Sequence, residues 1–172
     1  MEVLMQPDVK NLAIVLNLLS TARRIARAQA GTVYQREADG LRFLVTQNDE
    51  LARSVGHAMS ADLLTQTPLR WTEPSIATYV GLTGITLNIP DAYVIPPDKP
   101  YSFNSHIDRT TGFRTSSMLV VSLQHPINGV LQLINATHAS GDIVSFSRAA
   151  ELAVLELVSR ESEPSPTDNG PA

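Results

Sequence analysis

The stretch MLVVSLQHPINGVLQLIN, residues 118–135, decides the fold because two runs of apolar β-forming residues flank a single turn. The runs are Met118–Gln124 and Gly129–Asn135, and the Asn128-Gly129 pair is typical of tight hairpin turns. We therefore predict two antiparallel strands at the centre of a sheet.

A second hairpin is predicted earlier in the chain. Thr32–Gln35 and Leu41–Gln47 have the composition of strands, and the residues between them include Asp39-Gly40, another favoured turn pair. A short strand is expected at Leu87–Ile89. The four prolines of Pro90–Phe103 predict an irregular segment that covers the sheet.

The first helix is predicted from Asp8, its N-cap, to about Ala30, and its apolar residues fall into two stripes. One stripe comprises Val9, Leu12, Ala13, Leu16 and Leu19, and the other comprises Ile14, Val15, Leu18 and Ile25. A terminal helix with two apolar faces is rarely fully buried in a small protein, so we expect a homodimer through the terminal helices. The predicted dimer surface comprises Ile14, Val15, Leu18, Leu155 and Val158.

Two further helices are predicted. Residues Thr72–Ser75 offer a capped start for a helix that Gly81 and Gly84 stop, and Ser145 is the predicted N-cap of the last helix. Residues Leu51–Leu64 lack clean periodicity, and we expect a loop with some helix there.

This order of elements predicts an α+β fold with a central antiparallel sheet. The N- and C-terminal helices are expected to pack together on one face, and the irregular helix and loop segment to cover the other. We expect a single domain over residues 1–160 and a disordered polar tail over residues 161–172, because Pro, Ser, Gly and acids bury little surface. Because the chain starts with Met and ends in such a tail, we expect a whole gene product.

The composition excludes several classes of function. The 172 residues carry a net charge of −4, and the 13 Lys and Arg are scattered apart from Arg23, Arg24 and Arg27, which suit the end of the first helix. We therefore expect no nucleic-acid partner. The absence of cysteine excludes disulfides and thiolate chemistry. Neither a signal peptide nor a run of 18 apolar residues is found, so we expect a cytoplasmic location and no membrane contact.

No catalytic pattern is found in the sequence. The four histidines, His57, His106, His125 and His138, lack the spacing of metal ligands. The sequence contains neither the G-x-S-x-G elbow of serine hydrolases nor a phosphate-binding P-loop. We predict no metal site and no enzymatic activity.

The polar run before the first central strand is a candidate binding site. Its leading residues are Asp108, Thr111 and Thr115, because turn amides and hydroxyls can hold an anionic or heterocyclic ligand. The competing interpretation is a turn that leads into a core strand. The remaining candidates, at a helix start and among the aromatic residues, are Ser75, Ile76, Phe43, Tyr93 and Phe103. Helix starts favour anions and aromatic rings can stack on a purine, but both are also ordinary structural features.

Three stretches resemble the GAF domain, a small-molecule sensor module of phosphodiesterases, adenylyl cyclases and bacterial signalling proteins. They are AQAGTVYQREADGLRFLVTQND (28–49), SIATYVGLTGITLNIPDAY (75–93), and DRTTGFRTSSMLVVSL (108–123) with GVLQLINA (129–136). The resemblance implies a small ligand, in some members a cyclic nucleotide, held between the sheet and the irregular middle segment. The enzymatic branch of this family reduces free methionine sulfoxide with cysteines that this chain lacks.

The resemblance extends in part to the motif of the cyclic-nucleotide-binding members. Asn135, Phe146 and Glu151 match the motif, whereas Ala136 and Ala150 stand where the family has Lys and Asp. Losing one partner of a buried ion pair costs about 3–5 kcal/mol, but losing both to small apolar residues can be nearly neutral. We therefore expect the fold to be kept and leave the effect on nucleotide binding open.

Two functions follow from these observations. The first is a regulatory module that binds a small molecule, with a cyclic nucleotide as the leading candidate, and that signals through its terminal helices to an output protein. The second is a ligand-free dimerisation or protein-interaction module whose pocket is filled by its own side chains. The sequence leaves the ligand, the location of an output domain and the geometry of the dimer open.

Overall fold

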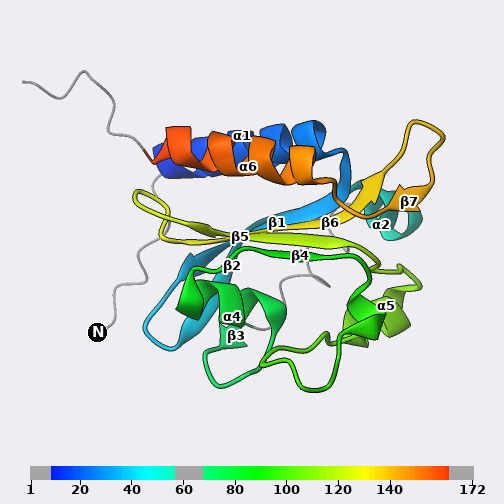
Figure 1. Cartoon of the computed structure of the whole chain (residues 1–172). Helices are drawn as coiled ribbons and strands as arrows, with labels where there is room; N and C mark the ends of the chain where they lie inside the picture. The colour runs from blue at the N-terminus through cyan, green and yellow to red at the C-terminus, as the bar shows by residue number, and fades with distance from the viewer. Residues whose placement is uncertain (1–8, 57–67, 163–172) are drawn as a thin grey trace, which may run out of the picture.

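The computed structural model describes residues 9–56 and 68–162 (Figure 1). The N-cap predicted at Asp8 and most of the tail predicted from residue 161 lie outside these residues. In chain order the elements are α1 (Val9–Ala26), β1 (Ala28–Arg36), β2 (Gly40–Asn48), α2 (Asp49–Val55), β3 (Leu69–Arg70), α4 (Ile76–Thr83), β4 (Leu87–Ile89), the 3-10 helix η1 (Ala92–Val94), α5 (His106–Thr111), β5 (Met118–Leu123), β6 (Gly129–Thr137), β7 (Ile143–Val144) and α6 (Arg148–Glu161).

The strands form one antiparallel sheet in the order β3-β2-β1-β6-β5-β4, and β7 pairs with the end of β6. Both predicted hairpins are present, as β1–β2 and β5–β6. They are joined by pairing of β1 with β6, in which Val33 lies opposite Leu131. The first and last hairpins of the sheet therefore meet at its centre.

The two faces of the sheet are covered by different layers (Figure 1). Helices α1 and α6 lie side by side on one face, and α4, α5 and the irregular segments lie on the other. Because side chains alternate along a strand, Leu131 and Leu133 of β6 point toward the helices, and Gln132 and Ile134 point to the opposite layer. The predicted α+β fold, with terminal helices on one face and an irregular cover on the other, is confirmed.

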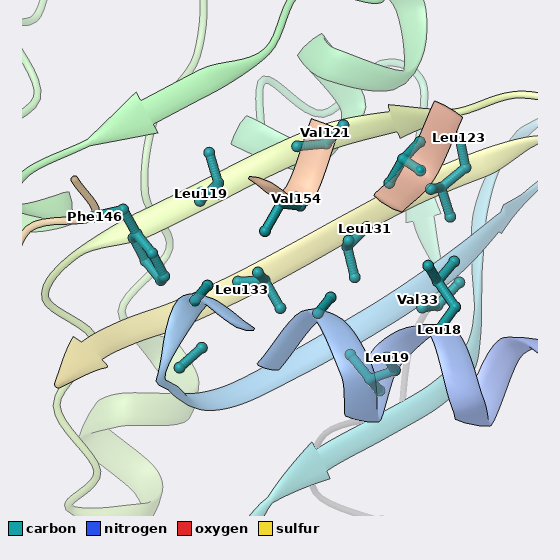
Figure 2. Packing of buried hydrophobic residues seen from close by; sticks show 14 of the residues in the cluster. Leu18, Leu19, Val33, Leu119, Val121, Leu123, Leu131, Leu133, Phe146 and Val154 are labelled. Carbon is teal, nitrogen blue, oxygen red and sulfur yellow. The ribbon is translucent and has the colours of Figure 1, made fainter. Parts of the chain in front are cut away.

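The helix-side core is apolar and closely packed (Figure 2). Leu19 of α1, Val154 of α6, and Leu119, Leu131 and Leu133 of the sheet have no exposed surface. Each fully buried side chain of this size stabilises the fold by about 1.5–3 kcal/mol relative to leaving it exposed. This cluster holds the two terminal helices on the sheet.

The predicted dimer surface is wrong at three of its five positions. Val15, Leu18 and Val158 are buried within the chain, at 3%, 1% and 7% exposure, and pack on the sheet. The buried face of α1 draws on both predicted stripes, because it joins Leu19 of the first stripe to Val15 and Leu18 of the second and continues through Ala22 and Ala26. The small side chains of Ala22 and Ala26 let the helix approach the sheet closely, whereas Ile14, Leu16 and Ile25 remain exposed.

Three local predictions also need correction. Residues 108–111 belong to the short helix α5 and not to an irregular turn. Ser147, not Ser145, caps α6, because the preceding residues Ile143–Val144 are still extended and paired with β6. Gly81 lies inside α4, and only Gly84, with a φ of 71°, ends that helix.

Replacing Leu133 with Ala should lower the free energy of unfolding by about 3–5 kcal/mol, because it leaves a cavity in the centre of the helix-side core. Urea denaturation followed by circular dichroism measures the change. The control is Leu82→Ala on α4, where the side chain is 55% exposed, and a change below about 0.5 kcal/mol is expected there. Equal effects of the two substitutions would contradict the described core.

Candidate functional site

A cavity of about 540 Å³ lies between the sheet and the layer that contains α4 and α5. Its floor is formed by strand residues Thr32, Tyr34, Phe43, Met118, Gln132 and Ile134. Its walls include Asn48, Glu73, Ser75, Ile76, Ala77, Ser102, Phe103, Asn104, His106, Ile107, Asp108, Phe113 and Thr115. This volume is within the range of pockets that hold small molecules, about 300–1,000 Å³.

The floor of the cavity carries polar groups in an otherwise apolar sheet. The amide of Gln132 donates to the hydroxyl of Tyr34 at 3.5 Å, and the hydroxyls of Thr32 and Thr46 lie 3.1 Å apart. Burial raises the pKa of Tyr34, so its phenol stays protonated and keeps its capacity to donate. The floor therefore offers a ligand both donors and acceptors.

Aromatic rings border this polar floor. The rings of Tyr34 and Phe43 lie 4.7 Å apart at an angle of 52°, and Phe103 and Phe113 line the walls. Aromatic faces at such positions suit a flat, weakly polar ligand.

The α4 wall is built by a helix start whose polar groups are already paired. The hydroxyl of Ser75 accepts from the backbone N–H of Thr78 at 3.1 Å, and the Thr78 hydroxyl accepts from the N–H of Ser75 at 3.1 Å. This capping box explains why the helix begins at Ile76. Glu73 lies just before it, is exposed, and makes no ion pair within residues 9–56 and 68–162.

Asp108 joins the α5 wall to the approach of β5. Its carboxylate accepts from the Thr115 N–H at 2.7 Å, from the Thr115 hydroxyl at 2.9 Å and from the Tyr93 hydroxyl at 2.7 Å. The hydrogen bond to Asp108 raises the pKa of Tyr93. Asp108 is 7% exposed. Its oxygens are thus engaged by the chain itself, and its first role is to hold the wall in place.

Six of the eight predicted ligand contacts lie along the cavity. They are Asp108, Thr115, Ser75, Ile76, Phe43 and Phe103, and their contact with a ligand stays a prediction. The other two do not line it. The hydroxyl of Thr111 donates to the Ile107 carbonyl at 2.8 Å within α5, and the exposed ring of Tyr93 packs on Phe103 with ring centres 5.1 Å apart.

The polar floor residues Thr32, Tyr34 and Gln132 were not predicted as site residues from the sequence. A signal was present, because each occupies a position of its strand that alternates with a core residue. Gln132, for example, stands between the fully buried Leu131 and Leu133. A polar side chain at such a position points to the face opposite the apolar core.

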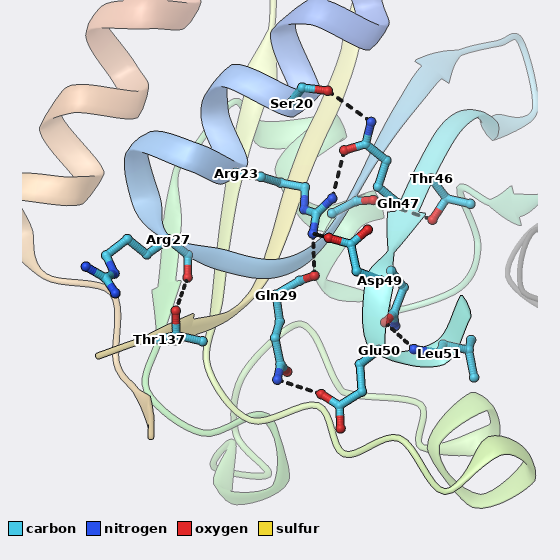
Figure 3. A network of polar contacts seen from close by, with 12 residues as sticks. Ser20, Arg23, Arg27, Gln29, Thr46, Gln47, Asp49, Glu50, Leu51 and Thr137 are labelled. Atoms are coloured by element: carbon cyan, nitrogen blue, oxygen red, sulfur yellow. Dashed lines mark hydrogen bonds and ion pairs between the residues drawn. The ribbon is translucent and has the colours of Figure 1, made fainter. Parts of the chain in front are cut away.

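A polar network connects α1 with the strands and α2 at one end of the sheet (Figure 3). The guanidinium of Arg23 donates to the Gln29 carbonyl at 2.6 Å, to Asp49 at 2.8 Å and to the Gln47 side chain at 2.9 Å. The side-chain amide of Gln29 donates to Glu50 at 2.6 Å. Arg23 is therefore mostly buried and links three elements.

Within residues 9–56 and 68–162, no group of three or more His, Asp or Glu residues lies close enough to hold a metal ion. In the same residues, no helix has the length and apolar composition needed to cross a membrane.

The model of the GAF domain family matches residues 12–162. The chain belongs to the GAF family. Among curated proteins, it is similar to a dual 3',5'-cyclic-AMP and -GMP phosphodiesterase 11A of Takifugu rubripes, with 39% identity over 71 residues. That match covers 40% of this chain but only 7% of the phosphodiesterase, so the chain spans a small part of this relative.

Solved structures share the GAF fold with this chain. A GAF domain/HD domain protein from Geobacter sulfurreducens has a TM-score of 0.65 at 14% identity, with 88% of each chain covered. The free methionine-R-sulfoxide reductase of Neisseria meningitidis has a TM-score of 0.57 at 16% identity, with 88% of this chain and 75% of that chain covered. At these identities the likeness shows the fold alone.

The residues that match the GAF motif lie away from the cavity. Asn135 is 2% exposed, and its side chain accepts from the Ser116 N–H at 2.7 Å and donates to Gln29 and to the Arg114 carbonyl. Asn88 of β4 donates to the Phe146 carbonyl at 3.1 Å and to Glu151 at 2.9 Å. These residues fasten the strands and α6 to one another.

The two departures from the motif are accommodated by apolar packing. Ala136 is buried at 4% exposure in the helix-side core, and Ala150 packs against the same core. No charge is left unpaired at either position, which agrees with the expectation that losing both charges keeps the fold.

Replacing Asp108 with Ala should lower the free energy of unfolding by about 2–4 kcal/mol, because the buried N–H of Thr115 loses its acceptor. Thermal and urea denaturation measure the loss. The control is Asp98→Ala at an exposed position, for which a change below about 0.5 kcal/mol is expected. An Asp108→Ala protein as stable as this control would show that the wall does not depend on these bonds.

Proposed function

We propose that this GAF domain is a regulatory module that binds a small molecule in the cavity and transmits its occupancy through the terminal helices to an output protein. The observation that carries the proposal is the cavity of about 540 Å³ with its polar floor and aromatic border. A cyclic nucleotide is the first ligand class to test, because a curated relative is a cyclic-AMP and -GMP phosphodiesterase. We further propose a non-enzymatic, cytoplasmic role.

The test is a thermal-shift screen of the full chain against cAMP, cGMP, cyclic dinucleotides, linear nucleotides and common metabolites. A ligand at 100 times its Kd adds about 2.7 kcal/mol to the stability. For a domain of this size that corresponds to a shift of about 5–10 °C. A screen without any shift would contradict the sensor function.

A hydrogen-bonded path leads from the α5 wall of the cavity to β1 and supports the transmission step. Thr115, held by Asp108, is followed by Ser116, whose N–H donates to Asn135 at 2.7 Å. The side-chain amide of Asn135 donates in turn to Gln29 at 2.9 Å. A displacement of the wall by a ligand would reach Gln29 through these bonds.

A second path starts at Asn48, which lines the cavity and caps α2. The next residues of the chain, Asp49 and Glu50, accept hydrogen bonds from Arg23 and Gln29. The path from the α5 wall and the path from Asn48 therefore both lead to Arg23 and Gln29, the two residues that hold α1 in place. A ligand would bias the helices only if it binds more tightly to one of two arrangements of this network.

Arg23 makes the network sensitive to small displacements. Its side chain is 13% exposed, and its Nε atom is buried without a hydrogen-bond partner among the described residues. Because Arg23 is mostly buried, losing any of its remaining hydrogen-bond partners would leave a desolvated charge at a high cost in free energy. Rearranging Gln29 should therefore move α1 together with Arg23.

Replacing Gln29 with Met should separate ligand binding from the response of α1, because it removes the amide and keeps a side chain of similar length. The probe is whichever of cAMP or cGMP shifts the melting temperature. We expect its Kd to change less than about threefold, corresponding to less than about 0.7 kcal/mol, while the ligand-induced amide shifts of α1 in NMR spectra fall. Gln35→Met, on the same strand but bonded to Arg42, is the control and should keep them. Unchanged α1 shifts in the Gln29 variant would contradict the path.

The second candidate function is a ligand-free dimerisation module. It is supported by exposed apolar residues on the terminal helices, with Ile14, Leu16 and Leu152 at 40%, 41% and 50% exposure. Ile14 and the partly buried Leu155 are the two predicted dimer residues that are not buried in the core.

Combining Ile14→Glu with Leu152→Glu should convert a homodimer into a folded monomer, because both substitutions place charges on the exposed side of the terminal helices. Light scattering coupled to size exclusion gives the mass, and circular dichroism reports the fold. Leu82→Glu, exposed on α4, should leave the mass unchanged. If the double variant keeps the mass of the unaltered protein, the terminal helices are not the dimer surface.

A further inference from the structure

A second, smaller pocket of about 240 Å³ lies at the end of α4. Its described lining comes from the last residues of α4 (81–84), from Arg36 and Leu41 of the β1–β2 hairpin, and from residues 122–124 and 128–129 of the β5–β6 hairpin. It shares no described lining residue with the larger cavity. Because its volume is below the usual range of about 300–1,000 Å³, it suits a ligand of only a few heavy atoms.

The charge in this second pocket comes from one side chain. Among the described residues that line it, Arg36 is the only one that is charged. Within residues 9–56 and 68–162, Arg36 makes no ion pair, and the adjacent Glu37 is paired with Arg42 instead. The positive charge of Arg36 is therefore available to an anionic group of a ligand.

The guanidinium of Arg36 is held in position by neutral groups. It donates to the Gly81 carbonyl, and its central carbon lies 4.6 Å from the centre of the Trp71 ring. That ring is fixed in turn, because its Nε1–H donates to the Glu37 carbonyl at 3.1 Å. A guanidinium has five N–H donors, so others remain for the two oxygens of a carboxylate.

The last turn of α4 offers the opposite charge. The N–H of Gly84 donates to the Val80 carbonyl at 2.8 Å, and the N–H of Ile85 donates to the Thr83 hydroxyl at 3.2 Å. Neither bond satisfies the carbonyls of Leu82 and Thr83, and no described residue donates to them. Both residues line the pocket. Because the end of a helix carries a partial negative charge, these carbonyls favour a cationic group.

The two features meet at one place. All carbonyls of a helix point toward its C-terminus, so those of Leu82 and Thr83 point the same way as the Gly81 carbonyl that accepts from Arg36. A simple anion would meet the negative end of the helix, and a simple cation would meet Arg36. A small zwitterion satisfies both, because it carries a carboxylate and an ammonium group a few bonds apart.

We infer that this second pocket binds a small free amino acid, whose carboxylate contacts Arg36 and whose ammonium group contacts the carbonyls of Leu82 and Thr83. The pocket is separate from the cavity, so the inference goes beyond the proposed function and does not depend on it. Helix α4 lies between the two sites, because Ile76 at its start lines the cavity and Thr83 at its end lines the second pocket.

The experiment titrates the nitrogen-15-labelled full chain with glycine, L-alanine, L-serine and L-valine and follows the amide signals by NMR. At least one of these probes should shift the signals of residues 81–84 and 128–129. The amide of that amino acid lacks the carboxylate, and its N-acetyl derivative lacks the ammonium group. Each should bind about tenfold more weakly or worse, because each loses one of the two charged contacts.

A pair of variants tests the role of Arg36. Arg36→Gln removes the charge but keeps an amide that can donate to Gly81, and it should weaken the same amino acid about tenfold or more. Arg42→Gln is the matched control, because Arg42 lies on the neighbouring strand and does not line the pocket. It should change the affinity less than about twofold. Melting temperatures show whether both variants fold, and the comparison of probes on the unaltered protein decides where Arg36→Gln does not.

Three outcomes overturn the inference: no amino acid shifts the signals of residues 81–84 and 128–129, the amide or the N-acetyl derivative binds as tightly as its parent, or a folded Arg36→Gln protein keeps the full affinity. The positions of the shifts separate this inference from the proposed function. Shifts confined to cavity residues such as Thr32 and Gln132 would reject the second site and keep the sensor function. Binding at the second pocket would stand even if no ligand entered the cavity.

Discussion

The close approach of α1 to the sheet is the constraint on which the rest of the structure depends. Ala22 and Ala26 face the strands, and Gly31 of β1 lies beneath the helix. A Cβ atom at Gly31 would lie 2.8 Å from Leu19 and 3.1 Å from Leu133, so a larger residue there would push the helix away. Because α6 packs beside α1, the whole helix layer follows this spacing.

The face of the sheet under α1 and α6 is packed with apolar side chains, and the opposite face carries the polar side chains of the cavity floor. The same strand β6 supplies Leu131 and Leu133 to the helix core and Gln132 to the cavity floor. One strand therefore couples the stability of the domain to the chemistry of its candidate site. The polar network around Arg23 and Gln29 lies at the end of the sheet and joins α1 to the strands and α2.

Local patterns predicted the parts of the fold that local physics determines. The hairpin turns at Asp39-Gly40 and Asn128-Gly129, and the capped start of α4 at Ser75, are encoded within a few residues. The burial of α1 was not predictable in this way, because the buried face combines Leu19 of one predicted stripe with Val15 and Leu18 of the other. The choice depends on the strand opposite, in particular on Gly31.

The same limit applies to the candidate site. Strand alternation could have identified Thr32 and Gln132, but nothing near Arg23 in the sequence indicates its side-chain partners, which lie 24 and 26 residues away at Gln47 and Asp49. For this reason Arg23 was predicted to complement the end of a helix. Likewise, the bonds that engage Asp108 come from Tyr93, 15 residues earlier, and Thr115, seven residues later, and are visible only once η1, α5 and β5 are assembled.

The missing Lys and Asp of the GAF motif bear on the fold and not on the cavity. Ala136 and Ala150 belong to the helix-side core, on the face opposite the polar floor. There α6 is fastened instead by the hydrogen bonds of Asn88 to Phe146 and Glu151, with Glu151 also paired to Arg148. The incomplete motif therefore does not by itself decide which ligand the cavity holds. That depends on the floor and walls of the cavity, whose described polar residues include Glu73, His106, Asp108 and Gln132.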